Sequence, residues 1–89
     1  MQTERFSGKV VAITGGAKGL GRGLTEALAQ AGAKLVVGDI DIEAAEALCA
    51  ELSRNGHAAV AIDVDVTDPA SVERLVDGTV ARHGRIDYM

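Results

Sequence analysis

Glycines crowd into one short stretch near the start of the chain, and their spacing indicates that a phosphate binds there. The segment 14–21 reads Thr-Gly-Gly-Ala-Lys-Gly-Leu-Gly and follows a run of apolar residues. Glycines let the backbone approach a pyrophosphate closely, and a helix that begins at such a turn adds free N–H groups and the positive end of its dipole. We therefore predict that a dinucleotide binds through a turn made of Gly15, Lys18, Gly19, Leu20 and Gly21.

An acidic residue farther along the chain fits the adenosine part of the same ligand. Asp39 lies about 18 residues after Gly21, at the end of a second apolar stretch, and a carboxylate at that distance typically accepts hydrogen bonds from the ribose hydroxyls. Its charge would repel the 2′-phosphate of NADP, so Asp39 favours NAD. A helix-capping or solvated acid is the alternative for this residue, because Asp41 lies beside it.

Two other phosphate-binding patterns do not fit the glycine-rich stretch. No literal Gly-x-Gly-x-x-Gly occurs, and Arg-Gly stands where a P-loop requires Lys followed by Ser or Thr. The pattern Thr14-Gly15-x-x-x-Gly19-x-Gly21 instead resembles that of the short-chain dehydrogenase/reductase family. A glycine-rich loop that only turns the chain is the remaining alternative, and its position between an apolar strand and an amphipathic helix disfavours it.

The resemblance extends to a second acidic segment and bears on the choice of cofactor. Asp65-Val66 is similar to the family's Asp-Val segment, in which the Asp meets the adenine amino group and the apolar residue packs on the ring. Lys18 occupies a position where NADP-preferring members often carry a basic residue, whereas Ile40 is not the second basic residue that many of them have. A carboxylate directed at the ribose outweighs one flexible, solvated lysine. We therefore predict NAD as the cofactor, with NADP as the less favoured alternative.

The resemblance also implies a reaction whose catalytic residues lie beyond this chain. Members of the family transfer a hydride between the nicotinamide and an alcohol or ketone, and their catalytic Ser, Tyr-x-x-x-Lys pair and Asn come later in the sequence. Tyr88 is not that tyrosine, because no Lys follows it. We therefore assign no catalytic residue and expect residues 1–89 to be the N-terminal part of a single NAD(P)-binding domain, inactive alone and belonging to a homo-oligomer. The alternative is a non-catalytic nucleotide-binding or interaction fragment.

Alternating strands and helices are expected around these sites. Apolar runs rich in β-branched residues indicate strands at 10–14, 34–38 and 58–66, of which only the first carries no charge, and a fourth strand is expected to begin at residue 85. Amphipathic stripes and capping residues indicate helices over 20–31, between Asp41 and Gly56, and between Asp68 and Gly84. Right-handed crossovers then give an incomplete α/β fold, a Rossmann-type doubly wound parallel sheet of strand order 3-2-1 with the fourth strand beside the first.

The expected buried face of each helix follows from its apolar spacing. The predicted stripes are Leu20, Leu24, Ala27, Leu28 and Ala31 in the first helix, Ala45, Leu48, Cys49 and Leu52 in the second, and Val72, Leu75, Val76 and Val80 in the third. In the third strand, one face is expected to carry Val60, Ile62, Val64 and Val66. Without a complete fourth strand, we expect the first strand to be an open edge.

Composition excludes several classes of partner. The net charge of −4 offers no basic surface for nucleic acid or an anionic membrane, and no apolar run approaches the length of a membrane span. The N-terminus has no apolar signal core, and the single Cys49 is compatible with a reducing compartment, so we predict a cytoplasmic protein. His57 and His83 have no neighbours at metal-ligand spacing, and no metal site is predicted.

Overall fold

A three-stranded parallel sheet forms the centre of the molecule. The computed structural model describes residues 6–87. Within them, β2 (Lys34–Asp39) lies between β1 (Val10–Thr14) and β3 (Ala59–Asp63). Val10 pairs with Lys34 in the first ladder, and both ladders are parallel. The predicted strand order 3-2-1 and the parallel α/β arrangement are confirmed.

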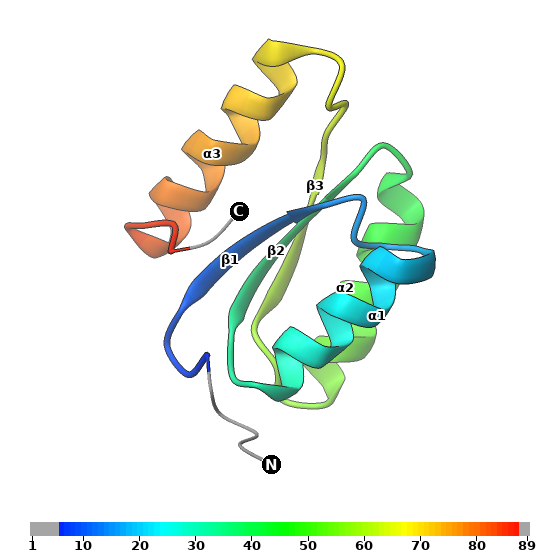
Figure 1. Ribbon diagram of the computed structural model, residues 1–89, viewed down its shortest axis with the longest axis vertical. Coiled ribbons are helices and arrows are strands. Elements are labelled where there is room, and N and C mark those ends of the chain that lie inside the picture. The colour runs from blue at the N-terminus through cyan, green and yellow to red at the C-terminus, as the bar shows by residue number, and fades with distance from the viewer. Residues whose placement is uncertain (1–5, 88–89) are drawn as a thin grey trace.

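Helices cover both faces of the sheet. α1 (Gly19–Gln30) and α2 (Ile42–Arg54) lie on one face, and α3 (Pro69–His83) lies on the other (Figure 1). α1 and α2 each return the chain to the amino end of the next parallel strand. The loops that follow the three strands therefore gather at the same end of the sheet (Figure 1).

Side chains alternate across the sheet and form two cores. Val11 and Leu35 belong to the core under α1 and α2, whereas Ala12 and Val36 pack with Leu75 of α3. Both Leu35 and Val36 are 0% exposed, because β2 has a strand on each side and helices on each face. The middle of this central strand, Leu35 to Gly38, is accordingly uncharged, and charged residues occur only at its ends, at Lys34 and Asp39.

The second and third helices begin and end as predicted. Asp41 accepts a hydrogen bond from the Ala44 N–H at the start of α2, and Asp68 accepts one from the Ala70 N–H at the start of α3. Gly84 ends α3 in the left-handed region, with a φ of 80°. The predicted stripe of α2 is confirmed, since its buried residues are Ala45, Leu48, Cys49 and Leu52.

The predicted buried stripe of α1 is largely wrong. Leu20 and Leu24 are 96% and 55% exposed, and the fully buried residues are instead Thr25 and Ala29. Gly21, one turn before Thr25, lies against the turn that follows β1. This contact sets the rotation of the helix, so that Thr25 and Ala29 are buried against the strands, Leu20 faces solvent and Leu24 lies at the margin of the core.

β3 ends at Asp63 instead of extending to Val66. Val60, Ile62 and Val64 pack in the core beside α3, as predicted, but Val66 is 62% exposed. The chain turns before Val66 because the Asp65 carbonyl accepts a hydrogen bond from the Asp68 N–H. The predicted face of this strand is therefore correct as far as Val64 and wrong at Val66.

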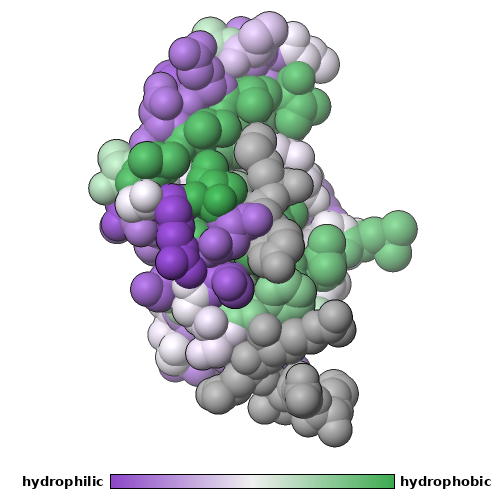
Figure 2. Space-filling view, turned by 60° about the vertical axis from the view of Figure 1, so that its left-hand side comes forward, coloured by the Kyte–Doolittle hydropathy of each residue, from purple (hydrophilic) through white to green (hydrophobic). Residues whose placement is uncertain are grey.

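α3 buries a narrower face than its apolar residues predict. The buried residues are Leu75 and, one turn before and after it, Ser71 and Thr79, whereas Val80 is 44% exposed. Figure 2 shows hydrophobic residues gathered in a band at the level of this helix. The prediction that Leu75 is buried is therefore confirmed, and the prediction that Val80 is buried is wrong.

One edge of β1 is only partly paired. Alternate residues of β1 bond to β2, and Val10, Ala12 and Thr14 direct their backbone groups to the opposite edge. At that edge the Asp87 N–H donates to the Val10 carbonyl (2.8 Å), and the Val10 N–H donates to the Asp87 carboxylate (2.8 Å). Within residues 6–87, Ala12 and Thr14 have no backbone partner there. The first strand is thus an open edge, as expected.

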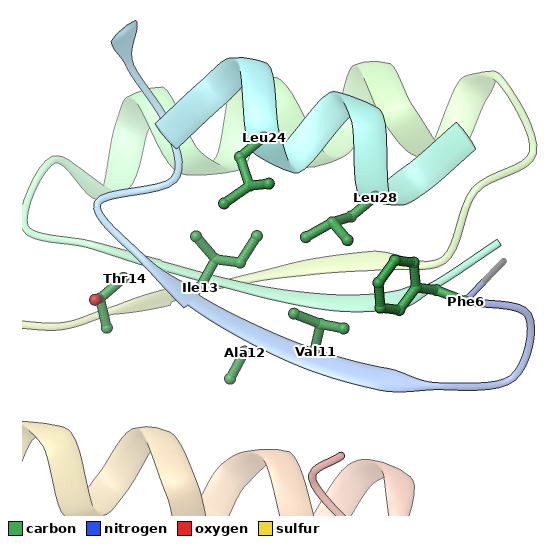
Figure 3. A pocket seen from close by; sticks show the side chains of 7 residues that line it. All are labelled: Phe6, Val11, Ala12, Ile13, Thr14, Leu24 and Leu28. Carbon is green, nitrogen blue, oxygen red and sulfur yellow. The ribbon is translucent and has the colours of Figure 1, made fainter. Parts of the chain in front are cut away.

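The predicted fourth strand is not formed in the described residues. Residues 84–87 have no strand pairing beyond the contact at Val10, and the remaining predicted positions, 88–89, lie outside the described residues. A cavity of about 390 Å³ borders the open edge, where Leu24 and Leu28 of α1 point toward Val11 and Ile13 of β1 (Figure 3). The exposed Leu24 and the partly buried Leu28 therefore flank an apolar cavity, whereas Leu20 does not line it.

Candidate functional site

The predicted site residues gather at the carboxyl end of the sheet, where the loops after β1, β2 and β3 meet (Figure 1). A cavity of about 280 Å³ lies between these loops. It is lined by Gly15, Asp39, Ile40, Val64, Asp65, Val66 and Thr67. Predicted residues from three separate loops therefore share one cavity, and this end of a parallel sheet is where ligands typically bind.

The turn after β1 follows a backbone path that suits glycine. Gly15 and Gly19 have φ values of 69° and 56°, which residues with a side chain rarely adopt. A Cβ on Gly21 would lie 3.2 Å from the Gly16 Cα and would overlap the Gly15 carbonyl oxygen. The start of α1 therefore rests directly on the turn, with no side chain between the two.

α1 begins without a side-chain cap. Lys18 precedes the helix but makes no capping hydrogen bond, and the first turn contains no acidic residue. α2 and α3, in contrast, are capped by Asp41 and Asp68. The first N–H groups of α1 and the positive end of its dipole remain available beside the glycine turn. This arrangement is suited to binding an anion such as a pyrophosphate.

Thr25 joins the glycine turn to the helix, and the sequence analysis missed it. Its fully buried hydroxyl lies 3.0 Å from the Gly16 carbonyl oxygen and 2.8 Å from the Gly21 carbonyl oxygen. A hydroxyl donates a single hydrogen, so the two carbonyls share it. The spacing of one helical turn between Gly21 and Thr25 is the signal that could have indicated this bond.

The Asp39 carboxylate is held in place by the backbone. Its Oδ2 accepts a hydrogen bond from the Ala17 N–H (3.2 Å), and its Oδ1 accepts one from the Asp41 N–H (3.0 Å). The residue is 9% exposed and lines the cavity. Each carboxylate oxygen keeps a further acceptor position, so Asp39 can also accept hydrogen bonds from hydroxyl groups of a ligand.

Lys18 lies beside this carboxylate but is paired with a different one. Its Nζ is 2.6 Å from Oδ2 of Asp41, and the two side chains are 66% and 38% exposed. Their hydrogen bond raises the pKa of Lys18 and lowers the pKa of Asp41. Both groups therefore carry their charge at neutral pH. Lys18 does not line the cavity in this arrangement.

Asp65 is fixed by the residues that follow it. Its Oδ1 accepts hydrogen bonds from the Thr67 hydroxyl (2.6 Å) and the Thr67 N–H (2.9 Å). These two bonds, the hydroxyl first, lower the pKa of Asp65. Its own N–H donates to the Ser71 hydroxyl (2.9 Å) at the start of α3. Asp65 is therefore an ionised acceptor of fixed position at the cavity wall.

Three apolar residues of the predicted site are exposed. Ile40 and Val66 are 70% and 62% exposed, and both line the cavity. Leu20, at the start of α1, is 96% exposed and does not belong to the cavity lining. An apolar ring placed in the cavity would contact Ile40 and Val66, which otherwise expose hydrophobic surface to water.

The metal-ligand geometry and the pKa values of His83 and Cys49 are the other features of residues 6–87 that could indicate reactive groups. Among residues 6–87, no group of three or more His, Cys, Asp or Glu side chains is placed to hold a metal ion. Burial, followed by the charges of Lys34 and Arg82, lowers the pKa of His83. Burial raises the pKa of the Cys49 thiol to about 11, which disfavours the reactive thiolate.

The helices of residues 6–87 are 12, 13 and 15 residues long. None of them combines the length and the hydropathy that a membrane crossing requires.

Comparison with known proteins supplies a family for this architecture. The sequence profile described as "short chain dehydrogenase" matches residues 9–89. Sorbitol dehydrogenase of Cereibacter sphaeroides is 46% identical over 85 residues, which are 96% of this chain and 32% of that protein. (+)-Borneol dehydrogenase 1 of Salvia officinalis is 41% identical over 98% of this chain and 32% of its own length. D-threitol dehydrogenase of Mycolicibacterium smegmatis is 40% identical over 96% of this chain and 33% of its own length.

A solved structure agrees with these relatives. The crystal structure of a hydroxysteroid dehydrogenase from Escherichia coli superimposes with a TM-score of 0.91 at 32% identity, and the match covers 97% of this chain and 36% of that one. The chain therefore spans about a third of the length of the relatives that it matches.

Proposed function

Because the chain belongs to the short chain dehydrogenase family, we propose that it forms the NAD-binding N-terminal part of an oxidoreductase that interconverts an alcohol and a ketone. The similarity to dehydrogenases named for sorbitol, borneol and threitol supports an alcohol as the class of substrate. When bound, NAD would accept or supply the hydride of such a reaction.

The observation that carries this proposal is the glycine turn at the start of α1. The positive φ values at Gly15 and Gly19 and the contact of Gly21 with the turn keep side chains away from the first N–H groups of the helix. That space adjoins the cavity that Asp39 lines, because Gly15 belongs to both. A pyrophosphate at the turn would therefore place an attached adenosine in the cavity.

The preference for NAD rests on the charge and burial of Asp39. Its carboxylate has acceptor positions for the 2′- and 3′-hydroxyls of the ribose, and a phosphate on the 2′-oxygen would bring two negative groups together at a 9% exposed site. Ile40, the next residue, supplies no cation to offset this repulsion. We therefore infer that NADP binds more weakly than NAD.

The adenine ring fits the remaining wall of the cavity. Ile40 and Val66 offer apolar surface from the loops after β2 and β3. The Asp65 carboxylate, which the Thr67 hydrogen bonds hold in place, can accept a hydrogen bond from the adenine amino group. The nine predicted residues thus fall into a pyrophosphate group around the turn and an adenosine group around the cavity.

We place the catalytic groups in sequence beyond these residues. The open edge at Ala12 and Thr14 and the apolar cavity beside it would receive a following strand and its cover (Figure 3). This agrees with the chain spanning about 32% of the length of its sorbitol dehydrogenase relative. Inactivity of the isolated segment, a homo-oligomeric assembly and a cytoplasmic location stay predictions.

Fluorescence titration of the full-length protein with NADH and NADPH tests the proposal. We expect NADH to bind at least about tenfold more tightly, which corresponds to about 1.4 kcal/mol. Tighter binding of NADPH would overturn the role of Asp39, and the absence of binding by either would overturn the proposed function.

Gly15→Val, with Gly56→Val as its control, tests the turn itself. Gly15 and Gly56 both have a positive φ and open space where a Cβ would lie, but Gly56 follows α2 at the opposite end of the sheet. Both variants should lose a similar amount of stability, and only Gly15→Val should abolish NADH binding while retaining its circular dichroism spectrum. Equal NADH affinity in the two variants would remove the glycine turn from the site.

A further inference from the structure

An ion pair crosses between the glycine turn and the start of α2. Lys18 is the last residue before α1, and Asp41 is the residue that caps α2. Their Nζ and Oδ2 atoms are 2.6 Å apart. The pair therefore joins the proposed pyrophosphate turn to the loop that carries Asp39.

The pair lies beside the carboxylate proposed to accept the ribose hydroxyls. Ala17, the neighbour of Lys18, donates its N–H to Asp39 Oδ2, and Asp41 donates its N–H to Asp39 Oδ1. The negative charge of Asp39 also contributes to raising the pKa of Lys18, after the hydrogen bond with Asp41 and the charge of Asp41. A phosphate on the 2′-oxygen of a ribose bound at Asp39 would consequently lie within reach of the Lys18 ammonium, if that ammonium were free to turn toward it.

We infer that Asp41 is a specificity-determining residue, which excludes a 2′-phosphorylated nucleotide by holding the Lys18 ammonium away from it. The inference rests on the proposed function, and it assigns the two acids different tasks. Asp39 binds the hydroxyls of the ribose, whereas Asp41 removes the nearest cation that could offset a 2′-phosphate. Asp41 acts through Lys18 and is not required to touch the nucleotide.

The two oxygens of Asp41 allow its two roles to be separated. Oδ1 accepts the capping hydrogen bond from the Ala44 N–H (3.1 Å), and Oδ2 holds Lys18. Asparagine caps helices about as well as aspartate. Asp41→Asn therefore preserves the start of α2 and removes the charge that holds Lys18.

A double-mutant cycle in the full-length protein tests the inference. NADH, NADPH and, as a probe without nicotinamide, adenosine 2′,5′-bisphosphate are titrated into the wild type, Asp41→Asn, Lys18→Gln and the double variant. Glu43→Gln is the matched control, because it removes one negative charge from the first turn of the same helix, and Lys18 pairs with Asp41 instead. Each titration is repeated at low and high salt.

Asp41→Asn should tighten the binding of NADPH and of the bisphosphate by up to about fivefold and change NADH affinity less than about twofold. The gain should disappear in the Lys18→Gln background and shrink at high salt, because the released ammonium is exposed. Glu43→Gln should change no affinity by more than about twofold.

Three results would overturn the inference. The first is unchanged NADPH affinity in Asp41→Asn, and the second is a gain of equal size with and without Lys18, which would mean that only the overall charge matters. In both cases wild-type NADH binding would leave the proposed function standing. The third is wild-type protein that binds neither dinucleotide, which would remove the proposed function and this inference together.

Discussion

Replacing Gly21 by alanine should disrupt the proposed site through a single methyl group. The new Cβ would lie 3.0 Å from the Gly15 carbonyl carbon and 3.2 Å from the Gly16 Cα, and it would overlap the Gly15 oxygen. Favourable carbon contacts lie at roughly 3.5–4.0 Å. All of the obstructing atoms are backbone, so no side chain can turn aside. The start of α1 and the glycine turn must therefore move apart.

The size of the effect follows from this displacement. Forcing a methyl group into a well-packed position costs about 1–3 kcal/mol of unfolding free energy. The same movement withdraws the first N–H groups of α1 from the turn, and each hydrogen bond to a charged group contributes about 1.5–3 kcal/mol. Losing one such bond to the pyrophosphate would weaken NADH binding by roughly tenfold to more than a hundredfold.

Gly23→Ala is the matched control for this change. It adds the same methyl group to the same helix, at a position where no described atom outside the neighbouring residues and the backbone of that helix lies within 4 Å of the new Cβ. Helix propensity alone should then raise stability by about 0.5–1 kcal/mol and leave NADH affinity unchanged. Both variants are measured in the full-length protein by denaturant unfolding and by NADH fluorescence titration. If Gly21→Ala matches Gly23→Ala in both measurements, the close contact between helix and turn has no role in binding.

Three further predictions address other parts of the structure. Asp39→Ala should weaken NADH binding and bring the dissociation constants of NADH and NADPH closer together, as measured by fluorescence titration. An unchanged ratio of the two dissociation constants would contradict the role of this carboxylate. Thr25→Val should lower the unfolding free energy by about 1–3 kcal/mol and weaken NADH, because two buried carbonyls lose a shared donor. The control is Thr79→Val, which removes an equally buried hydroxyl that is bonded only to the Leu75 carbonyl. It should lower the unfolding free energy by less and leave NADH affinity unchanged. Equal losses of stability and affinity in the two variants would contradict the role of the shared hydrogen bond. With a pKa of about 11, about one Cys49 thiol in a thousand is ionised at pH 8. Mass spectrometry should therefore find it unmodified by iodoacetamide until the protein unfolds, and modification of the native protein at the rate of a free thiol would refute this.

Much of the fold could be predicted because its signals are local. The strand at Val10–Thr14 is a short uncharged run, and Asp41, Asp68 and Gly84 mark helix ends through side chains or backbone conformations that act within one turn. The stripe of α2, which includes Leu48, was predicted because that helix packs on the sheet with its most apolar face. Parallel pairing then followed from the alternation of strands and helices.

The rotation of α1 could not be predicted from hydrophobicity. Leu20 and Leu24 are two of the three leucines of that helix, yet the residues that are fully buried are Thr25 and Ala29, and Gly21 contacts the turn. Close approach favours small residues there, and hydrophobic periodicity does not measure close approach. The same limit applies to the candidate site. Sequence spacing indicated its residues, but the contact between Lys18 and Asp41 could not be predicted because it depends on how two separate loops pack together.

The arrangement of loops at the carboxyl end of the sheet has a consequence for engineering and for evolution. Every residue proposed to bind the nucleotide falls between Gly15 and Val66, in the loops that follow the three strands, at the start of α1 or at the end of β2. The residues proposed to determine the coenzyme preference thus lie in one continuous segment of chain. We expect a chimaera that receives this segment from a homologue to inherit the donor's coenzyme preference while keeping the recipient's own substrate.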